Sequence, residues 1–191
     1  MFTDETSFEV GVVKGKVRIW RRRGSRFHGR NIVHSKRSGR HSVMFWGGIT
    51  ATSKTALIEC HSPFTALAYE NQILQPFCLP FLRSNNISIL QQDNAPVHTA
   101  RSVQAWITAH NIECLAWPAL SPDLNPIENI WAYLKLQVQK RASPSISLSA
   151  FKEIVHEEWN KIPNYLLISL VASMQNRCNL VLAKAGDSIK Y

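Results

Sequence analysis

The sequence predicts a mixed α/β domain in which a β-sheet is flanked by helices. β-rich segments come first, as one strand and a hairpin, and helices and strands then alternate. Strand–helix–strand crossovers join parallel neighbours, so the sheet should be mixed. The 191 residues, 45% of them hydrophobic, are enough for one domain with a core. We expect a single domain over 1–191, with a basic insertion at about 11–42 and a helical tail at about 146–191.

The β-rich segments predict three strands of this sheet. Residues 1–8 form the first strand, and residues 42–50 (SVMFWGGIT) form a second, apolar one. A turn at 51–54 then leads into residues 56–60, which complete a hairpin. A further short strand is predicted inside the basic insertion, where Val17 to Trp20 alternate in polarity.

Helical periodicity dominates the second part of the chain. A helix is predicted at 65–83, kinked or split by Pro76 and Pro80, and another at 99–110, capped by Thr99. Short strands at 87–91 and 112–117 bracket the second of these helices. An apolar stripe predicts a strong helix over 126–141. The tail predicts helices at 148–161 and 165–183, after a linker at 142–147.

The positive charge is concentrated in one segment. The net charge is +9, and residues 14–41 hold eleven of the 22 basic residues and no acidic one. Such a segment binds polyanions readily, although a solvated loop or a localisation signal explains it equally well. The candidate DNA-binding residues are Lys14, Lys16, Arg18, Arg21, Arg22, Arg23, Arg26 and Arg30.

The remaining composition indicates an intracellular protein that is not embedded in a membrane. The four cysteines are widely spaced and form no CxxC motif, so we expect reduced thiols. No uninterrupted apolar run approaches the ~20 residues of a membrane span. The amino-terminal residues MFTDETSFEV lack a signal-peptide pattern.

Three carboxylates are candidates for metal chemistry. Asp93 follows the apolar run 87–90, Glu128 lies on the first turn of the helix at 126–141, and Asp4 lies near the end of the first strand. Phosphodiester cleavage at neutral pH is served by two divalent ions about 3.5–4 Å apart. Mg²⁺ prefers carboxylate and water oxygens, so two or three carboxylates are sufficient to hold it.

Each carboxylate also has a purely structural explanation. Glu128 follows Asn125 and Pro126 and fits the reciprocal position of a capping box. Asp93 fits an Asx turn, and Asp4 fits a solvated terminal carboxylate. Glu5 and Asp123 are rival ligands, with a turn the better explanation of Asp123. We expect structural roles for His98 and Asn125, and core positions for Trp117 and Trp131.

Four segments together resemble the catalytic domain of mariner-superfamily transposases. They are FTDE at 2–5, SVMFWGGI at 42–49, LQQDNAPVHTA at 90–100 and WPALSPDLNPIENIWAYLK at 117–135. In one large branch of that superfamily 34 residues separate the second Asp from the Glu, and 34 residues lie between Asp93 and Glu128. The loop VRIWRRRGSRFH and the final helices are similar too, so the resemblance covers nearly the whole chain.

The resemblance implies a ribonuclease H-like fold with Asp4, Asp93 and Glu128 as catalytic, metal-binding triad. It also implies Mg²⁺ or Mn²⁺ as cofactor, transposon ends and TA dinucleotides as DNA partners, a homodimer or larger complex, and nuclear action. Full-length members carry amino-terminal helix-turn-helix domains, and none precedes Asp4 in this sequence. We therefore expect only nonspecific, salt-sensitive DNA binding.

Three functions remain open at this stage. The first is a metal-dependent DNA strand transferase of cut-and-paste transposition. The second is a truncated or domesticated noncatalytic DNA-binding protein derived from such an enzyme. The third is a nuclease of the same fold that cuts DNA without joining it.

Overall fold

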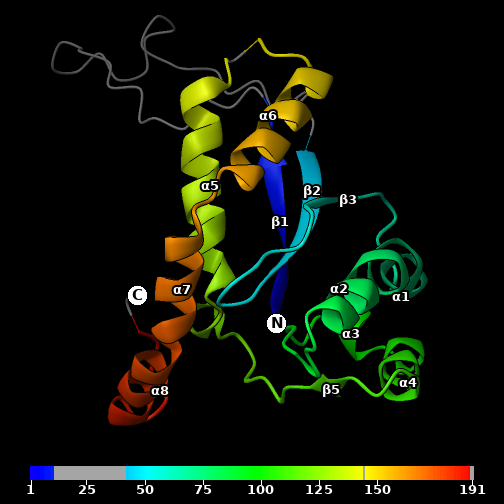
Figure 1. The fold of residues 1–191 in the computed structure, drawn as a ribbon, viewed down its shortest axis with the longest axis vertical. Helices are drawn as coiled ribbons and strands as arrows, with labels where there is room; N and C mark the ends of the chain where they lie inside the picture. Colours follow the sequence, from blue (N-terminus) through cyan, green and yellow to red (C-terminus); the bar gives the residue numbers. More distant parts are fainter. Residues whose placement is uncertain (11–41, 144, 190–191) are drawn as a thin grey trace, which may run out of the picture.

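The computed structural model describes residues 1–10, 42–143 and 145–189 (Figure 1). The strand expected at 17–20 and all eight candidate DNA-binding residues fall outside these ranges.

Three antiparallel strands form the first part of the sheet. They are β1 (Phe2–Glu9), β2 (Ser42–Ile49) and β3 (Ile58–Cys60), in the order β1-β2-β3. The predicted hairpin is present, but its second strand is shorter than expected. Asp4 is the third residue of β1 and pairs with Gly47.

A separate parallel pair lies next to β1. It consists of β4 (Ile89–Leu90) and β5 (Glu113–Cys114), both shorter than the sequence predicted. A parallel bridge between Phe2 and Gln91 joins β1 to the end of β4. The antiparallel sheet and the parallel pair are thus two sheets linked by one bridge, which together give the mixed strand arrangement that the sequence predicted.

The helical segment after β3 is continuous although it contains two prolines. It comprises α1 (Ala66–Tyr69), the π-helical turns η2 (Glu70–Cys78) and α2 (Leu79–Ser84). Pro76 lies within the wider π turns, and Pro80 lies where these turns pass into α2. The helix type changes between the two prolines, whereas we expected a kink or a split.

The next predicted helix is in fact two helices. They are α3 (Pro96–Thr99) and α4 (Arg101–Ala109), separated by Ala100 in an extended conformation with ψ of 139°. The prediction that Thr99 caps a helix at 99–110 is therefore wrong. The Thr99 hydroxyl donates instead to the Ala95 carbonyl, across the single turn of α3.

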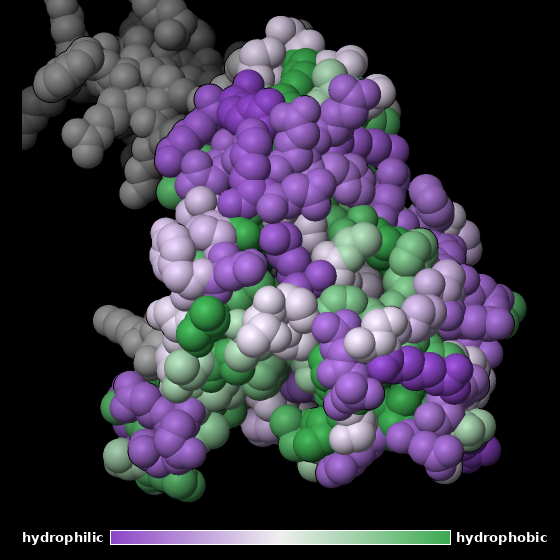
Figure 2. All heavy atoms as spheres, in the orientation of Figure 1, coloured by the Kyte–Doolittle hydropathy of each residue, from purple (hydrophilic) through white to green (hydrophobic). Residues whose placement is uncertain are grey.

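Four helices complete the chain: α5 (Ile127–Arg141), α6 (Leu148–Asn160), α7 (Asn164–Ala172) and α8 (Met174–Ala183). The helix expected at 165–183 is divided at Ser173. Segment Asn164–Ala183 is long and apolar enough to cross a membrane by length and composition. That result departs from our expectation, and only 11% of the apolar window is buried. Figure 2 shows apolar side chains at the surface here, and Tyr165 and Leu182 are exposed.

The sheet separates two clusters of buried side chains. Phe45 and Trp46 are neighbours in β2 and point to opposite faces, each into a different cluster. Helices α5 and α6 cover the Phe45 face, where Trp131 and Trp159 stack at 5.2 Å between ring centroids. A Cβ on Gly47 would lie 2.9 Å from each of these indoles, so only glycine lets the helices approach this closely.

Candidate active site

The three predicted carboxylates line one pocket. Asp4 comes from β1, Asp93 follows β4, and Glu128 lies in the first turn of α5. All three border a cavity of about 400 Å³, whose wall also includes Trp117, Asn125 and the loop residues between them. The sequence prediction that these side chains converge is therefore met, although their separation along the chain is large.

The parallel bridge between Phe2 and Gln91 explains why Asp4 and Asp93 meet. The Thr3 N–H donates to the Gln91 carbonyl at 3.1 Å, and the Gln91 N–H donates to the Met1 carbonyl at 2.8 Å. In a parallel pair both chains advance together, so two residues beyond the bridge bring Asp4 level with Asp93.

Asp4 is held at both carboxylate oxygens. Its Oδ1 accepts the Glu5 N–H at 2.8 Å, and its Oδ2 accepts the Trp131 indole Nε1–H at 3.3 Å. Burial raises the pKa of Asp4, and the negative charges of Glu128 and Glu5 raise it further, to about 7. Negative groups are thus crowded around Asp4, and a bound cation would relieve this repulsion.

Asp93 is oriented from one side only. Its Oδ1 accepts the Ala95 N–H at 2.9 Å, which is the expected Asx turn, and contacts His98 Nδ1 at 2.6 Å. Within the ranges that the structure describes, its Oδ2 has no hydrogen-bond partner, and the side chain is 54% exposed. The turn and a ligand role are therefore compatible, because they use different oxygens.

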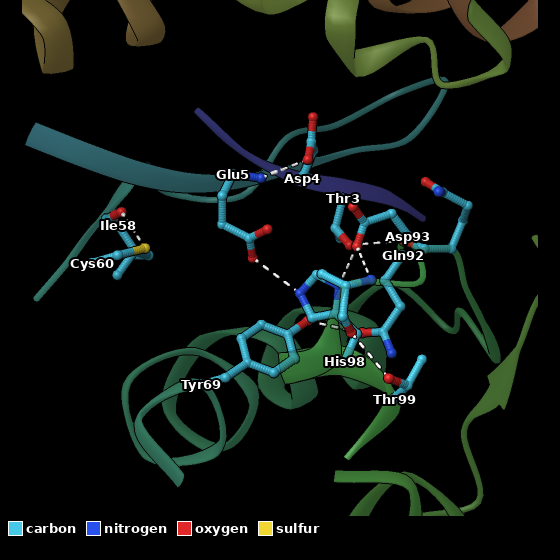
Figure 3. A network of polar contacts seen from close by, with 12 residues as sticks. Thr3, Asp4, Glu5, Ile58, Cys60, Tyr69, Gln92, Asp93, His98 and Thr99 are labelled. Carbon is cyan, nitrogen blue, oxygen red and sulfur yellow. Dashed lines mark hydrogen bonds and ion pairs between the residues drawn. The ribbon is translucent and has the colours of Figure 1, made fainter. Parts of the chain in front are cut away.

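His98 links Asp93 to Glu5 (Figure 3). The imidazole is buried, and its Nε2 lies 3.3 Å from Glu5 Oε1. Burial opposes the charged form, but the hydrogen bonds and charges of Glu5 and Asp93 outweigh it and raise the pKa of His98 to about 9. The Tyr69 ring packs on the imidazole at 4.7 Å between centroids, and the Tyr69 hydroxyl donates to Gln92.

From the sequence we expected a structural role for His98, and we considered Glu5 an alternative metal ligand to the three candidate carboxylates. Adjacent residues of a strand point to opposite faces, so Glu5 leaves the pocket that Asp4 lines. Glu5 is paired with Trp46 across the strands and points toward His98, as Figure 3 shows. Asp93 and His98 are five residues apart, and this short separation was a sequence signal for their contact. His98 and Glu5 are 93 residues apart, and no pattern in neighbouring residues indicated that they meet.

Glu128 is exposed and does not complete a capping box. The Asn125 N–H that such a box requires donates to the Pro122 carbonyl at 3.0 Å. Asn125 itself caps α5 loosely, since its Oδ1 accepts the Ile127 N–H at 3.4 Å, and its Nδ2 donates to the Thr3 carbonyl. The cap is therefore made by Asn125 without help from the Glu128 carboxylate.

The remaining candidates take structural positions. Asp123 is absent from the pocket wall, and its Oδ2 accepts the Ile189 N–H at 2.8 Å. Trp131 is buried as expected, and it also holds Asp4. Trp117 is only half-buried, borders the pocket and meets Phe2 edge to face, so its expected core position is wrong.

The donor set fits a hard divalent cation. Across the described ranges, no three His, Cys, Asp or Glu side chains are grouped tightly enough to enclose a metal ion by themselves. Mg²⁺ seldom needs such a cage, because it keeps several waters and is held by one or two carboxylates plus substrate phosphates. Carboxylate oxygens that repel one another beside an open pocket meet that requirement.

Strands flanked by helices, with acidic side chains converging on a pocket at their edge, are typical of ribonuclease H-like nucleases and transferases. The particular family follows from sequence comparison. Residues 1–149 match the family described as DDE superfamily endonuclease, and the chain belongs to that family.

Transposases are similar to the chain over its whole length. The Tcb2 transposase of Caenorhabditis briggsae is 32% identical over 193 residues, covering 100% of this chain and 70% of the relative. The Tc1 transposase of Caenorhabditis elegans is also 32% identical over 194 residues, with the same coverage. These homologues support cut-and-paste DNA transposition as the function of the family members related to this chain.

Solved structures of Mos1 transposase share the fold. The Mos1 paired-end complex with the left transposon end has a TM-score of 0.78 at 20% identity, over 98% of this chain and 55% of that one. The Mos1 catalytic domain with Raltegravir and Mg has a TM-score of 0.66 at 19% identity, over 78% of each chain. The present chain thus spans about half of the longer Mos1 chain, and the predicted ribonuclease H-like fold is confirmed.

Proposed function

We propose that Asp4, Asp93 and Glu128 are the catalytic, metal-binding residues of a DNA-cleaving and strand-transferring domain. The observation that carries this proposal is their convergence on one pocket from three separate elements. Mg²⁺ or Mn²⁺ fits the all-oxygen donor set. When bound, such ions supply an activated oxygen nucleophile and stabilise the leaving oxygen.

The chain's own residues fix two of the three ligands before any ion arrives. The Glu5 N–H and the Trp131 indole hold Asp4, while the Asx turn and His98 hold Asp93. Ligands that are already oriented need no reorganisation during the reaction, which is how an enzyme site gains rate. Glu128 is positioned by the first turn of α5.

The partners follow from the same proposal. DNA is the substrate, as transposon ends and as a TA target, and a homodimer or larger complex would bring two ends together. The basic segment, outside the described residues, would contribute contacts to the DNA backbone from Lys14, Lys16, Arg18, Arg21, Arg22, Arg23, Arg26 and Arg30. Action on chromosomal DNA would place the protein in the nucleus.

Metal-dependent cleavage of plasmid DNA tests the proposal. We expect nicking of supercoiled plasmid in Mg²⁺ or Mn²⁺ and none in EDTA. Glu128→Gln keeps the size of the side chain but removes its negative charge. It should slow nicking at least about 100-fold, or roughly 2.7 kcal/mol. Glu153→Gln is the matched control, because Glu153 is an exposed glutamate on α6, away from the pocket.

The alternatives are separate outcomes of this experiment. DNA binding that persists in EDTA, without cleavage in Mg²⁺, would establish the noncatalytic function. Nicking without joining of a supplied 3′-hydroxyl duplex would establish a plain nuclease. Equal cleavage by Glu128→Gln and the parent would remove Glu128 from the site.

A further inference from the structure

Arg177 is a buried cation that the proposed mechanism does not use. It lies on α8, and it is 1% exposed. Its Nε donates to the Ser173 hydroxyl at 3.0 Å, its Nη1 to the Asp123 carbonyl at 2.8 Å, and its Nη2 to the Asn129 side-chain oxygen at 2.7 Å. A buried guanidinium is costly unless its donors are satisfied, so these contacts fix its place.

Two of these acceptors lie next in the chain to residues that line the candidate active site. Asp123 lies in the short turn η3 (Pro122–Leu124), within a loop whose neighbouring residues Ser121 and Asn125 border the pocket. Asn129 directly follows Glu128 in α5. A single planar group on the last helix therefore joins the pocket loop to the helical turn that carries Glu128.

The carboxyl-terminal segment holds the same loop at a second point. The chain reverses after α8 through Ala185 and Gly186, which have φ angles of 53° and 95°. The buried Ile189 then donates its N–H to Asp123 Oδ2 at 2.8 Å. Asp123 is thus held at its backbone by Arg177 and at its side chain by Ile189. Figure 1 shows α7 and α8 beside the lower, amino-terminal end of α5.

We propose that Arg177 is a positioning residue for the active site, which holds the first turn of α5 and the loop at 121–125 in a fixed relation. The proposal rests on the proposed role of Glu128. Within the described ranges the Glu128 carboxylate has no hydrogen bond of its own, so its place depends on the backbone beneath it. A shift of about 1 Å in such a group can slow a reaction about 100-fold.

Arginine suits this task better than lysine would. Its donors lie in a rigid plane and can reach acceptors on different elements at once, whereas an ammonium is a point charge on a flexible stem. Arg177→Lys therefore keeps the charge and removes the fixed connection. Asn129→Ala removes the contact between Arg177 and α5 and leaves the contact of Arg177 with Asp123 in place.

Hydrogen exchange in the metal-free protein tests the positioning directly. Arg177→Lys should raise exchange at the amides of Leu124, Asn125 and Glu128 at least about tenfold, while amides of β1 and β2 are unaffected. Mn²⁺ should bind about tenfold more weakly, and plasmid cleavage at saturating metal should slow about 10-fold to 100-fold. The double variant Arg177→Lys/Asn129→Ala should be no worse than Arg177→Lys, because both remove the same contact.

Arg141→Lys is the matched control. Arg141 pairs with Glu157 and Glu158 at the opposite end of α5, where its loss should lower stability without changing the pocket. Equal effects of the two Arg→Lys variants on exchange at the loop and on Mn²⁺ affinity would overturn the proposal. If Arg177→Lys fails to fold, unchanged exchange in Asn129→Ala overturns it instead. Absence of cleavage by the parent would refute the proposed function, while the exchange result would still decide whether Arg177 holds the loop.

Discussion

Thr3 donates twice to the carbonyl of Gln91, from its backbone N–H at 3.1 Å and from its hydroxyl at 2.7 Å. These two bonds join the antiparallel and parallel parts of the sheet, and they lie next to Asp4 in the chain. The alignment of Asp4 with Asp93 therefore depends on a contact between a buried threonine and a backbone carbonyl 88 residues away.

Thr3→Val should test the strength of this junction. Valine keeps the shape of threonine but loses the hydroxyl bond, so we expect the free energy of unfolding to fall by about 1 kcal/mol. Urea denaturation measures the loss. Thr108→Val is the control, because the exposed Thr108 hydroxyl also donates to a carbonyl, within α4. An equal fall in the free energy of unfolding of both variants would show that the Thr3–Gln91 contact stabilises the protein no more than an ordinary hydroxyl–carbonyl bond.

The pairing of His98 with Glu5 predicts a rescue. His98→Phe keeps an aromatic ring against Tyr69 but leaves the Glu5 carboxylate, 15% exposed, without its partner. We expect a loss of about 3–5 kcal/mol in the free energy of unfolding. Adding Glu5→Gln removes the unpaired charge and should restore part of that stability.

A double-mutant cycle over these two positions decides the point. The two losses should be clearly non-additive, by about 1 kcal/mol or more. Additive losses would mean that the 3.3 Å contact between His98 and Glu5 contributes nothing to stability.

The raised pKa of Asp4 predicts a pH dependence of stability without metal. Folded Asp4 keeps its proton up to about pH 7, whereas its ordinary pKa is 3.8. The folded state therefore binds more protons between these values, and stability falls as the pH rises through that window. Asp4→Asn should be more stable than the parent at pH 8, by an amount on the order of 2–3 kcal/mol, and equally stable near pH 3.

Thermal unfolding in EDTA across this pH range measures the difference. Mg²⁺ or Mn²⁺ should then stabilise the parent at pH 8 more than it stabilises Asp4→Asn, because the charged Asp4 carboxylate gains a partner. A parent whose stability does not respond to pH between about 4 and 7 would contradict the crowding of charge around Asp4.

The basic segment predicts a salt effect. Replacing Arg21, Arg22 and Arg23 by alanine should weaken DNA binding. It should also lower the slope of log affinity against log salt by up to about 2.7, if each arginine contacts one phosphate. Replacing Arg83 and Lys140 by alanine serves as the control, because both side chains are exposed. An unchanged slope in the triple variant would assign those arginines to solvent or to a protein partner.

Local signals predicted much of the fold correctly. The apolar stripe of α5 and the β-rich run of β2 were found within a residue or so of their observed bounds. These elements are recognisable because helical or strand periodicity is written into consecutive residues. The two short strands were predicted in the right places but too long. β4 and β5 are two residues each, and their extent depends on their neighbours rather than on their own residues.

The sequence by itself was sufficient to name the three candidate carboxylates, to give the spacing between Asp93 and Glu128, and to indicate the class of chemistry that such side chains support. The tertiary structure decided how they are held. It paired Asp4 with Trp131, Asp93 and Glu5 with His98, and the first turn of α5 with Arg177. Most of these contacts join residues far apart in the chain, and no local period encodes a hydrogen bond of that range. They exist only because the sheet and the carboxyl-terminal helices pack around one another.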